Sequence, residues 1–211
     1  MLIYYPMMMN LSQRRCVVIG GGQVAERKVI SLLEAEANVV VVSPDITPPL
    51  SSMAQKGLIQ HVPRRYRKGD LAGSFLCVVA TDDPRLHQRI RIEAGDHGVL
   101  ANIVNSREDS DFLVPSYFRR GDLSVCISTA GKSPALAKRI RRDLEGQFGW
   151  EYEVLLEILT ELRPLILEEV TDPERRRCIL EKTGDPELLD LIRVTDRGNL
   201  SNRVWAYLMH P

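Results

Sequence analysis

Short apolar runs alternate with segments of helical periodicity through the first hundred residues. Strands are predicted at 16–19, 39–42, 58–62, 75–80 and 99–104, and the continuous apolar run at 39–42 is typical of a parallel strand that is buried on both faces. Helices are predicted between them, from about residue 24, over 48–56 and over 84–95, where helix-starting residues or helical spacing occur. Strands and helices in this alternation predict a doubly wound parallel α/β sheet.

The pattern changes after Asn105. Two extended runs, 111–118 and 123–128, flank the turn sequence Arg-Arg-Gly-Asp, which predicts a β-hairpin. A helix is expected next, with Ser133 as its N-cap and Pro134 at its first position. From Trp150 the chain is expected to be helical, with breaks near 171–173 and 184–186. These features predict a Rossmann-like domain at 1–106, a hairpin-plus-helix segment at 107–148 and a helical domain at 149–211.

The first predicted strand runs directly into three glycines and then into a helix. Gly20 permits a tight turn, Gly22 lets backbone N–H groups approach phosphates, and Ala25 is small enough for close packing of the helix. The helix N-terminus attracts an anion. We therefore expect a dinucleotide's pyrophosphate here, although such a turn also occurs in plain α/β packing. The residues concerned are Gly20, Gly21, Gly22, Gln23, Val24 and Ala25.

Polar residues follow the other predicted strands at the edge where a ligand of such a sheet binds. Asp45 follows the second strand, and a carboxylate there binds the ribose 2′-OH of NAD, whereas an arginine would favour NADP. No arginine stands next to it, so NAD is expected, with a plain turn role for Asp45 as the alternative. The further cofactor-binding candidates are Ser43, Pro44, Thr81 and Asp82.

Composition excludes several classes of protein. Lys plus Arg and Asp plus Glu both number 28 among 211 residues, so charge indicates neither a nucleic-acid nor a membrane partner. No apolar run is long enough to span a bilayer, and the first residues do not resemble a signal peptide. The four cysteines form no CxxC pair and the four histidines have no metal-ligand spacing, so no metal site is expected. We expect a cytoplasmic protein.

Five blocks, taken in order, identify a family. They are Tyr-Pro at 5–6 with GGGQVAERK at 20–28, ATDD at 80–83, NIV at 102–104, DFLVP at 111–115 and ISTAGKSPALA at 127–137. As a set they resemble the bifunctional precorrin-2 dehydrogenase/sirohydrochlorin ferrochelatase family, which includes the amino-terminal half of siroheme synthase. The resemblance covers about residues 3–145.

The resemblance implies an enzyme of siroheme biosynthesis that oxidises precorrin-2 to sirohydrochlorin with NAD⁺. Some members also insert Fe²⁺, and the family forms homodimers through the segment that corresponds to 107–148. A tetrapyrrole with many carboxylates needs positive charge and hydrogen-bond donors, although the basic residues near 138–142 also fit a solvated helix face. The substrate-binding candidates are Asn102, Ser128, Thr129, Gly131, Lys132 and Ser133.

The chain departs from this family at Asn105, where the family has a catalytic aspartate. An amide cannot accept a proton at neutral pH, so Asn105 is not a general base. Either Asn105 orients the substrate and the proton goes to water, or Asp109 or Asp111 substitutes, although Asp111 also fits a structural role at a strand start. Asn105 and Asp111 are therefore the catalytic candidates, and iron insertion should suffer more than oxidation.

Two other functions remain open. Asn105 is compatible with a non-catalytic module that binds NAD or a tetrapyrrole. An unrelated Rossmann oxidoreductase of a small substrate is the other alternative, which the block at 128–137 opposes because such enzymes do not need it.

Overall fold

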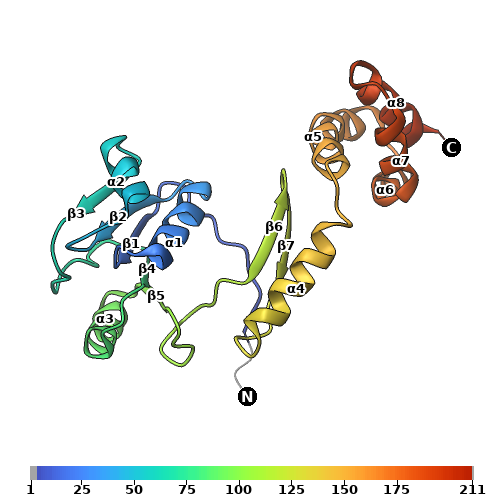
Figure 1. Cartoon of the computed structure of the whole chain (residues 1–211). Coiled ribbons are helices and arrows are strands. Elements are labelled where there is room, and N and C mark those ends of the chain that lie inside the picture. Colours follow the sequence, from blue (N-terminus) through green and yellow to red (C-terminus); the bar gives the residue numbers. More distant parts are fainter. Residues whose placement is uncertain (1–3, 211) are drawn as a thin grey trace. The chain divides into compact units, whose positions relative to one another are not determined.

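The computed structural model describes residues 4–210, which form two compact units that divide between Val114 and Pro115 (Figure 1). The first unit contains a five-stranded parallel sheet with the strand order β3-β2-β1-β4-β5. Its strands are β1 (Arg15–Ile19), β2 (Asn38–Val42), β3 (Ile59–Val62), β4 (Leu76–Val79) and β5 (Leu100–Ile103). The order reverses between β1 and β4, as in doubly wound sheets. The predicted Rossmann-like α/β fold is confirmed.

Both faces of this sheet are covered by helices, which explains why its central strands β1, β2 and β4 are almost entirely apolar. Cys16 and Val18 are buried together with Ala25 of α1, and α2 contributes to the same core. Ile19, on the opposite face, is buried with Ile90 of α3. The helices are α1 (Gln23–Glu34), α2 (Pro48–Gln55) and α3 (Pro84–His97).

The second unit combines a hairpin with helices. Strands β6 (Ser116–Arg120) and β7 (Leu123–Ile127) pair antiparallel, and α4 (Pro134–Glu145) packs on both. Ser133 caps α4 by accepting a hydrogen bond from the Leu136 N–H at 3.3 Å, as predicted. The remaining elements are α5 (Glu151–Glu169), α6 (Pro173–Glu181), η1 (Lys182–Gly184), α7 (Pro186–Val194), η2 (Arg197–Asn199) and α8 (Leu200–Met209). Their apolar side chains form a separate core.

One predicted strand is wrong at its beginning. The extended run 111–118 pairs in the hairpin only from Ser116 onward. The Asp111 N–H instead donates to the Ala101 carbonyl at 2.8 Å, and the Asn102 side chain donates to the Phe112 carbonyl at 2.9 Å. Backbone groups that the hairpin would need are thus bound beside β5.

Candidate functional site

The carboxyl ends of β1, β2 and β4 are joined by backbone hydrogen bonds around the glycine turn that follows β1. The Gly20 N–H donates to the Val42 carbonyl of β2 at 3.1 Å, and the Ala80 N–H donates to the Ile19 carbonyl of β1 at 2.8 Å. The Thr47 N–H donates to the Gly21 carbonyl at 3.0 Å. These bonds place the predicted cofactor-binding residues of three separate segments around one turn.

The turn has no room for side chains at its first two glycines. Gly20 has φ of 115°, and a Cβ atom added to it would lie 2.3 Å from the Ala80 carbonyl oxygen. A Cβ atom on Gly21 would lie 2.0 Å from the Asp45 carbonyl oxygen. At Gly22, by contrast, such an atom meets nothing within 4 Å among the described residues. The first two glycines are therefore required by the fold, and the third leaves space in front of helix α1.

Helix α1 begins without a side-chain cap in the part of the chain that the structure describes, because its N-cap residue is Gly22. The first N–H groups of a helix have no intrahelical carbonyl partner, and the helix dipole adds partial positive charge there. Glu26 stands in the same first turn, but its carboxylate accepts a hydrogen bond from the Thr47 hydroxyl at 2.6 Å. This helix start fits a phosphate group.

The loop after β2 is fixed from inside. Ser43 is buried, and its hydroxyl donates to the Asp45 carbonyl at 2.7 Å. Pro44 and Asp45 are exposed. His61 of β3 lies with its Nε2 atom 3.0 Å from the Ser43 carbonyl oxygen. These contacts hold the loop in place and leave Asp45 exposed to solvent.

The loop after β4 is held in a similar way. The His87 Nε2 atom lies 2.7 Å from the Thr81 carbonyl oxygen and 3.1 Å from the Thr81 hydroxyl. Asp82 is exposed, and Asp83 caps α3 by accepting from the Arg85 N–H at 3.0 Å. The histidines were considered from the sequence only as metal ligands, so both of these contacts were missed.

Asn105 lies in the turn directly after β5, exposed and with φ of 66°. Asn102, in β5 itself, is buried and donates its side-chain amide to the Phe112 carbonyl. In the turn that follows, the Ser106 hydroxyl donates to the carboxylate of Asp109 at 2.5 Å. Asn105 and Asp109 are therefore exposed to solvent. The Asn102 side chain instead holds the segment that follows the turn.

The carboxylate of Asp111 makes structural contacts on both of its oxygens. One oxygen lies 2.8 Å from Arg91 Nη2, and the other accepts from Arg91 Nη1 at 3.0 Å and from the Ala101 N–H at 2.9 Å. Asp111 therefore joins α3 to β5, a structural role that differs from the strand start considered from the sequence.

The predicted substrate-binding residues 128–133 belong to the second unit, on the loop between β7 and α4. The Thr129 hydroxyl donates to the Ser133 carbonyl at 3.0 Å and accepts from the Ser133 N–H at 3.1 Å. The Ser128 hydroxyl accepts from the Ala130 N–H at 3.1 Å, Gly131 has φ of 75°, and Lys132 is exposed. This loop is an internally bonded turn with one exposed ammonium group.

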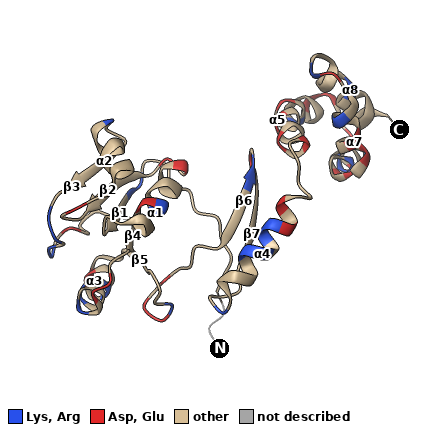
Figure 2. Ribbon diagram, viewed as in Figure 1, with Lys and Arg blue, Asp and Glu red and all other residues tan. Residues whose placement is uncertain are grey.

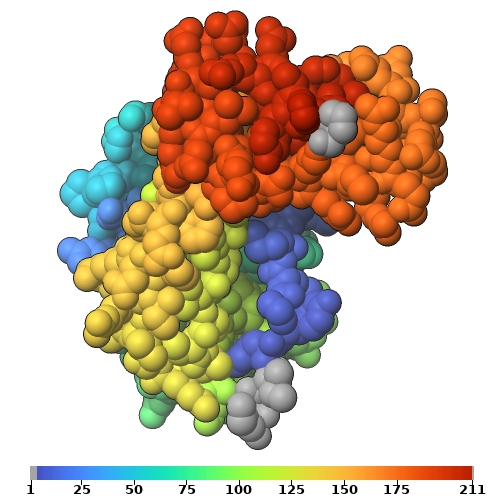
Figure 3. Space-filling model, turned by 90° about the vertical axis from the view of Figure 1, so that its right-hand side faces the viewer, coloured from blue at the N-terminus to red at the C-terminus, as the bar shows by residue number. Residues whose placement is uncertain are grey.

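Positive charge is concentrated on the helix that follows this loop (Figure 2). Arg139 and Arg141 form ion pairs one helical turn ahead with Asp143 and Glu145. Lys138 and Arg142 are exposed. Figure 3 shows α4 in yellow at the molecular surface. Arg139 and Arg141 are thus paired along the helix, although 81% of the Arg139 side chain is exposed, and Lys138 and Arg142 are exposed as well.

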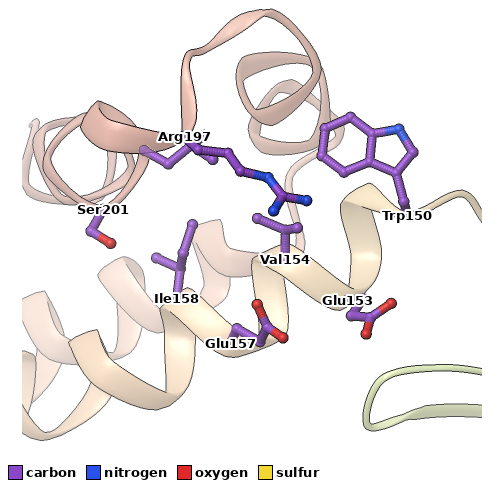
Figure 4. A pocket seen from close by; sticks show the side chains of 8 residues that line it. Trp150, Glu153, Val154, Glu157, Ile158, Arg197 and Ser201 are labelled. Atoms are coloured by element: carbon purple, nitrogen blue, oxygen red, sulfur yellow. The ribbon is translucent and has the colours of Figure 1, made fainter.

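A separate pocket of about 430 Å³ lies in the helical region, between α5 and the η2–α8 segment (Figure 4). In Figure 4 the Arg197 side chain extends toward Val154 and the indole of Trp150. No predicted site residue lines this pocket. Its lining is Trp150, Glu153, Val154, Glu157, Ile158, Arg197, Leu200 and Ser201.

Metal-binding and reactive-thiol chemistry find little support in the side chains. Within residues 4–210 no three His, Cys, Asp or Glu side chains are grouped so that they could hold a metal ion. Burial raises the pKa of Cys16 to about 11 and that of Cys77 to about 12, so both thiols stay protonated at neutral pH. Across the same residues, none of the helices combines the length and apolarity needed to cross a bilayer.

Comparison with known proteins gives the same assignment over almost the whole chain. Residues 7–116, slightly more than half of the chain, match the family described as "Putative NAD(P)-binding", and residues 120–147 match "Sirohaem biosynthesis protein central". The siroheme synthase of Chromobacterium violaceum is 32% identical over 207 residues, which are 96% of this chain and 44% of that protein. The siroheme synthase of Thioalkalivibrio sulfidiphilus is 34% identical over 188 residues, 89% of this chain and 38% of that protein.

A solved structure titled "SirC, precorrin-2 dehydrogenase" superimposes with a TM-score of 0.79 and 29% identity, covering 97% of this chain and 98% of that one. The chain spans less than half the length of the siroheme synthases it matches. These matches confirm the relationship that the five sequence blocks indicate, and they confirm a nicotinamide cofactor as the class of ligand. The chain belongs to the family described as "Putative NAD(P)-binding" and is related within it to siroheme synthases and to precorrin-2 dehydrogenase.

Proposed function

We propose that this chain oxidises precorrin-2 to sirohydrochlorin with NAD⁺ in siroheme biosynthesis. The observation that carries the proposal is the glycine turn, which is enclosed by two loops and opens onto an uncapped helix start. A pyrophosphate fits this place because the helix offers unpaired N–H groups and no side chain blocks Gly22. The likeness to a precorrin-2 dehydrogenase over the whole chain supports the choice of substrate. NAD⁺, when bound, supplies the hydride acceptor.

The loop after β2 supports NAD rather than NADP. Asp45 is exposed there, and a carboxylate at this position accepts from the ribose 2′-OH and repels a 2′-phosphate. Arg64 follows strand β3, which pairs with β2. The sequence alone did not indicate that this arginine comes after the strand next to the loop. Its guanidinium is bound to both oxygens of Asp70, at 2.8 and 2.7 Å, and this hydrogen bonding lowers the pKa of Asp70. Arg64 is therefore not free to bind a phosphate.

The proton released in the oxidation passes to water in our proposal. Asn105 cannot accept it. The carboxylate of Asp111 is bound by the Arg91 guanidinium and the Ala101 N–H, and that of Asp109 by the Ser106 hydroxyl. Asn105 instead orients the tetrapyrrole through its amide. A neutral residue at position 105 also attracts Fe²⁺ less than a carboxylate and cannot accept pyrrole protons, so we propose slow iron insertion.

The second unit contains residues that we propose bind the substrate and join two copies of the chain. Residues 128–133 would bind substrate carboxylates, with Lys132 as the exposed cation. Of the described residues in the hairpin and α4, Phe118 and Ala137 alone are buried, which is little core for a two-stranded hairpin and one helix. Among the described residues neither β6 nor β7 pairs with a third strand, so we propose a homodimer through 107–148. Four free cysteines favour a cytoplasmic location.

Incubation of the purified chain with precorrin-2 and NAD⁺ tests the proposal. We expect the absorbance of sirohydrochlorin to appear together with that of NADH, and NADP⁺ to be the poorer cofactor. Iron insertion is followed separately by supplying sirohydrochlorin and Fe²⁺ under anaerobic conditions. Tight NAD⁺ binding without any turnover would instead support the non-catalytic module.

Asn105→Asp is expected to accelerate iron insertion by about tenfold or more, because a positioned general base contributes on the order of a hundredfold or more to proton transfer. Its backbone should be undisturbed, because Asn and Asp both tolerate the positive φ of 66° at this position. Initial rates of metallation and of dehydrogenation are measured for both forms. Asn105→Gly, which keeps the backbone and removes the side chain, is the control and should insert no faster than wild type. Rapid iron insertion by the wild type, unaltered in Asn105→Asp, would contradict our view of Asn105.

A further inference from the structure

Two histidines bind the loops on either side of the glycine turn through the same ring nitrogen. His61, in β3, lies with Nε2 3.0 Å from the carbonyl oxygen of Ser43, the first residue after β2. His87, in the first turns of α3, lies with Nε2 2.7 Å from the carbonyl oxygen of Thr81, in the loop after β4. Each contact joins a loop at the cofactor site to the next secondary-structure element outward.

The direction of both hydrogen bonds follows from the acceptors. A carbonyl oxygen can only accept, so Nε2 must carry the proton in both histidines. At His87 the Thr81 hydroxyl oxygen also lies close to this nitrogen, at 3.1 Å. Because the peptide group is planar and trans, fixing the Thr81 carbonyl also directs the Asp82 N–H away from the imidazole.

The two loops are in direct contact with the glycine turn. The Ala80 carbonyl oxygen limits the space at Gly20, and the Asp45 carbonyl oxygen limits it at Gly21, at 2.3 and 2.0 Å from the Cβ positions. A small displacement of either loop would therefore change the width of the turn that receives the dinucleotide. A loop without a hydrogen bond to a neighbouring element would not stay against the turn, because loops are the mobile parts of a fold.

We propose that His61 and His87 are positioning residues for the dinucleotide, which hold the Ser43 and Thr81 carbonyls and so keep both loops against the glycine turn. Neither histidine needs to touch the cofactor. The inference rests on cofactor binding at the turn, and it is independent of the tetrapyrrole substrate.

Titration of the intact chain with NAD⁺ by calorimetry tests this with His87→Leu and His87→Gln. Loss of one hydrogen bond to a backbone carbonyl weakens binding by about fivefold, which we expect for His87→Leu. A glutamine side chain carries its Nε2–H at a reach similar to that of histidine, so His87→Gln should restore affinity to within about twofold. His61→Leu and His61→Gln should behave in the same way.

His97→Leu is the matched control, because His97 is an exposed imidazole in the last turn of the same helix. It should bind NAD⁺ like the wild type. With substrate, His87→Leu should raise KM for NAD⁺ and leave KM for precorrin-2 unchanged, which general loss of structure would not do. Thermal unfolding of each variant shows that the folded form is being titrated.

The inference is overturned if the leucine variants bind NAD⁺ as tightly as wild type, if the folded glutamine variants fail to recover affinity, or if His97→Leu is equally weakened. These outcomes leave the proposed function intact, since the wild type still binds and turns over. A wild type that binds neither NAD⁺ nor NADP⁺ would overturn both.

Discussion

Gly21→Ala weakens dinucleotide binding by roughly a hundredfold, the expected result of forcing one methyl group into a space that is already filled. The new Cβ atom would lie 2.0 Å from the Asp45 carbonyl oxygen and 2.8 Å from the Ser43 hydroxyl oxygen. Backbone and a buried side chain cannot both yield, so the loop after β2 must move away from the turn. The measurement is an NAD⁺ titration together with a thermal unfolding curve, which should also show a lower Tm.

Gly22→Ala is the control for this change. Its Cβ atom meets no described atom within 4 Å, so stability should stay within about 1 kcal/mol of wild type, the usual cost of alanine at an N-cap. Any loss of affinity in Gly22→Ala then reports a methyl group against the ligand rather than against the fold. Wild-type affinity in Gly21→Ala would show that the loop after β2 is not part of the cofactor site.

Arg193→Met should destabilise the helical region, because it removes one partner from an ion pair whose carboxylate is buried. The carboxylate of Glu151, at the start of α5, is buried and bound by the Arg193 guanidinium from α7. Without the arginine it must stay charged in an apolar place or take up a proton. Urea unfolding followed by circular dichroism measures the loss.

The dependence of this loss on pH follows from the carboxyl group. Burial acts to raise the pKa of Glu151, but the hydrogen bond and charge of Arg193 together with backbone hydrogen bonds outweigh it, so the pKa is lowered. A lowered folded-state pKa contributes stability above the unfolded value of about 4.3, and this contribution disappears as the pH falls through the folded pKa. The difference between wild type and Arg193→Met should therefore be full at neutral pH and shrink below about pH 4.3.

Glu151→Gln combined with Arg193→Met is the matched control. Replacing both charges should recover part of the lost stability, because no ionised group then remains buried without a partner. Equal stability of Arg193→Met and wild type at neutral pH would mean that the ion pair does not hold α5 to α7.

The sheet could be predicted from the sequence because its strands are buried on both faces. Val17, Val18 and Ile19 are each almost fully buried, so nothing but apolar residues fits there, and such runs are visible without a structure. The glycine turn was equally legible, since Gly20 adopts a φ that other residues rarely take. Local sequence thus determines both the sheet and the glycine turn that we propose binds the dinucleotide.

The contacts that brace the site are not local and left no such signal. His61 reaches Ser43 only because β2 and β3 pair in parallel, with Val41 beside His61, and spacing along the chain does not reveal that register. Asp111 begins a polar-then-apolar run that looks like a strand start, yet Arg91 from α3 binds its side chain. A backbone position is encoded by the residue that occupies it, whereas these contacts depend on which elements the fold brings side by side.

The left-handed backbone at Asn105 also bears on how such an enzyme changes over evolutionary time. Asparagine and aspartate codons differ by a single base, and both residues adopt a φ near 66° more readily than most others. Exchange between them would then meet no barrier from the fold, so selection could act on the chemistry of the site alone. Under the proposed role of Asn105, one point mutation at this position would be enough to change the rate of metal insertion.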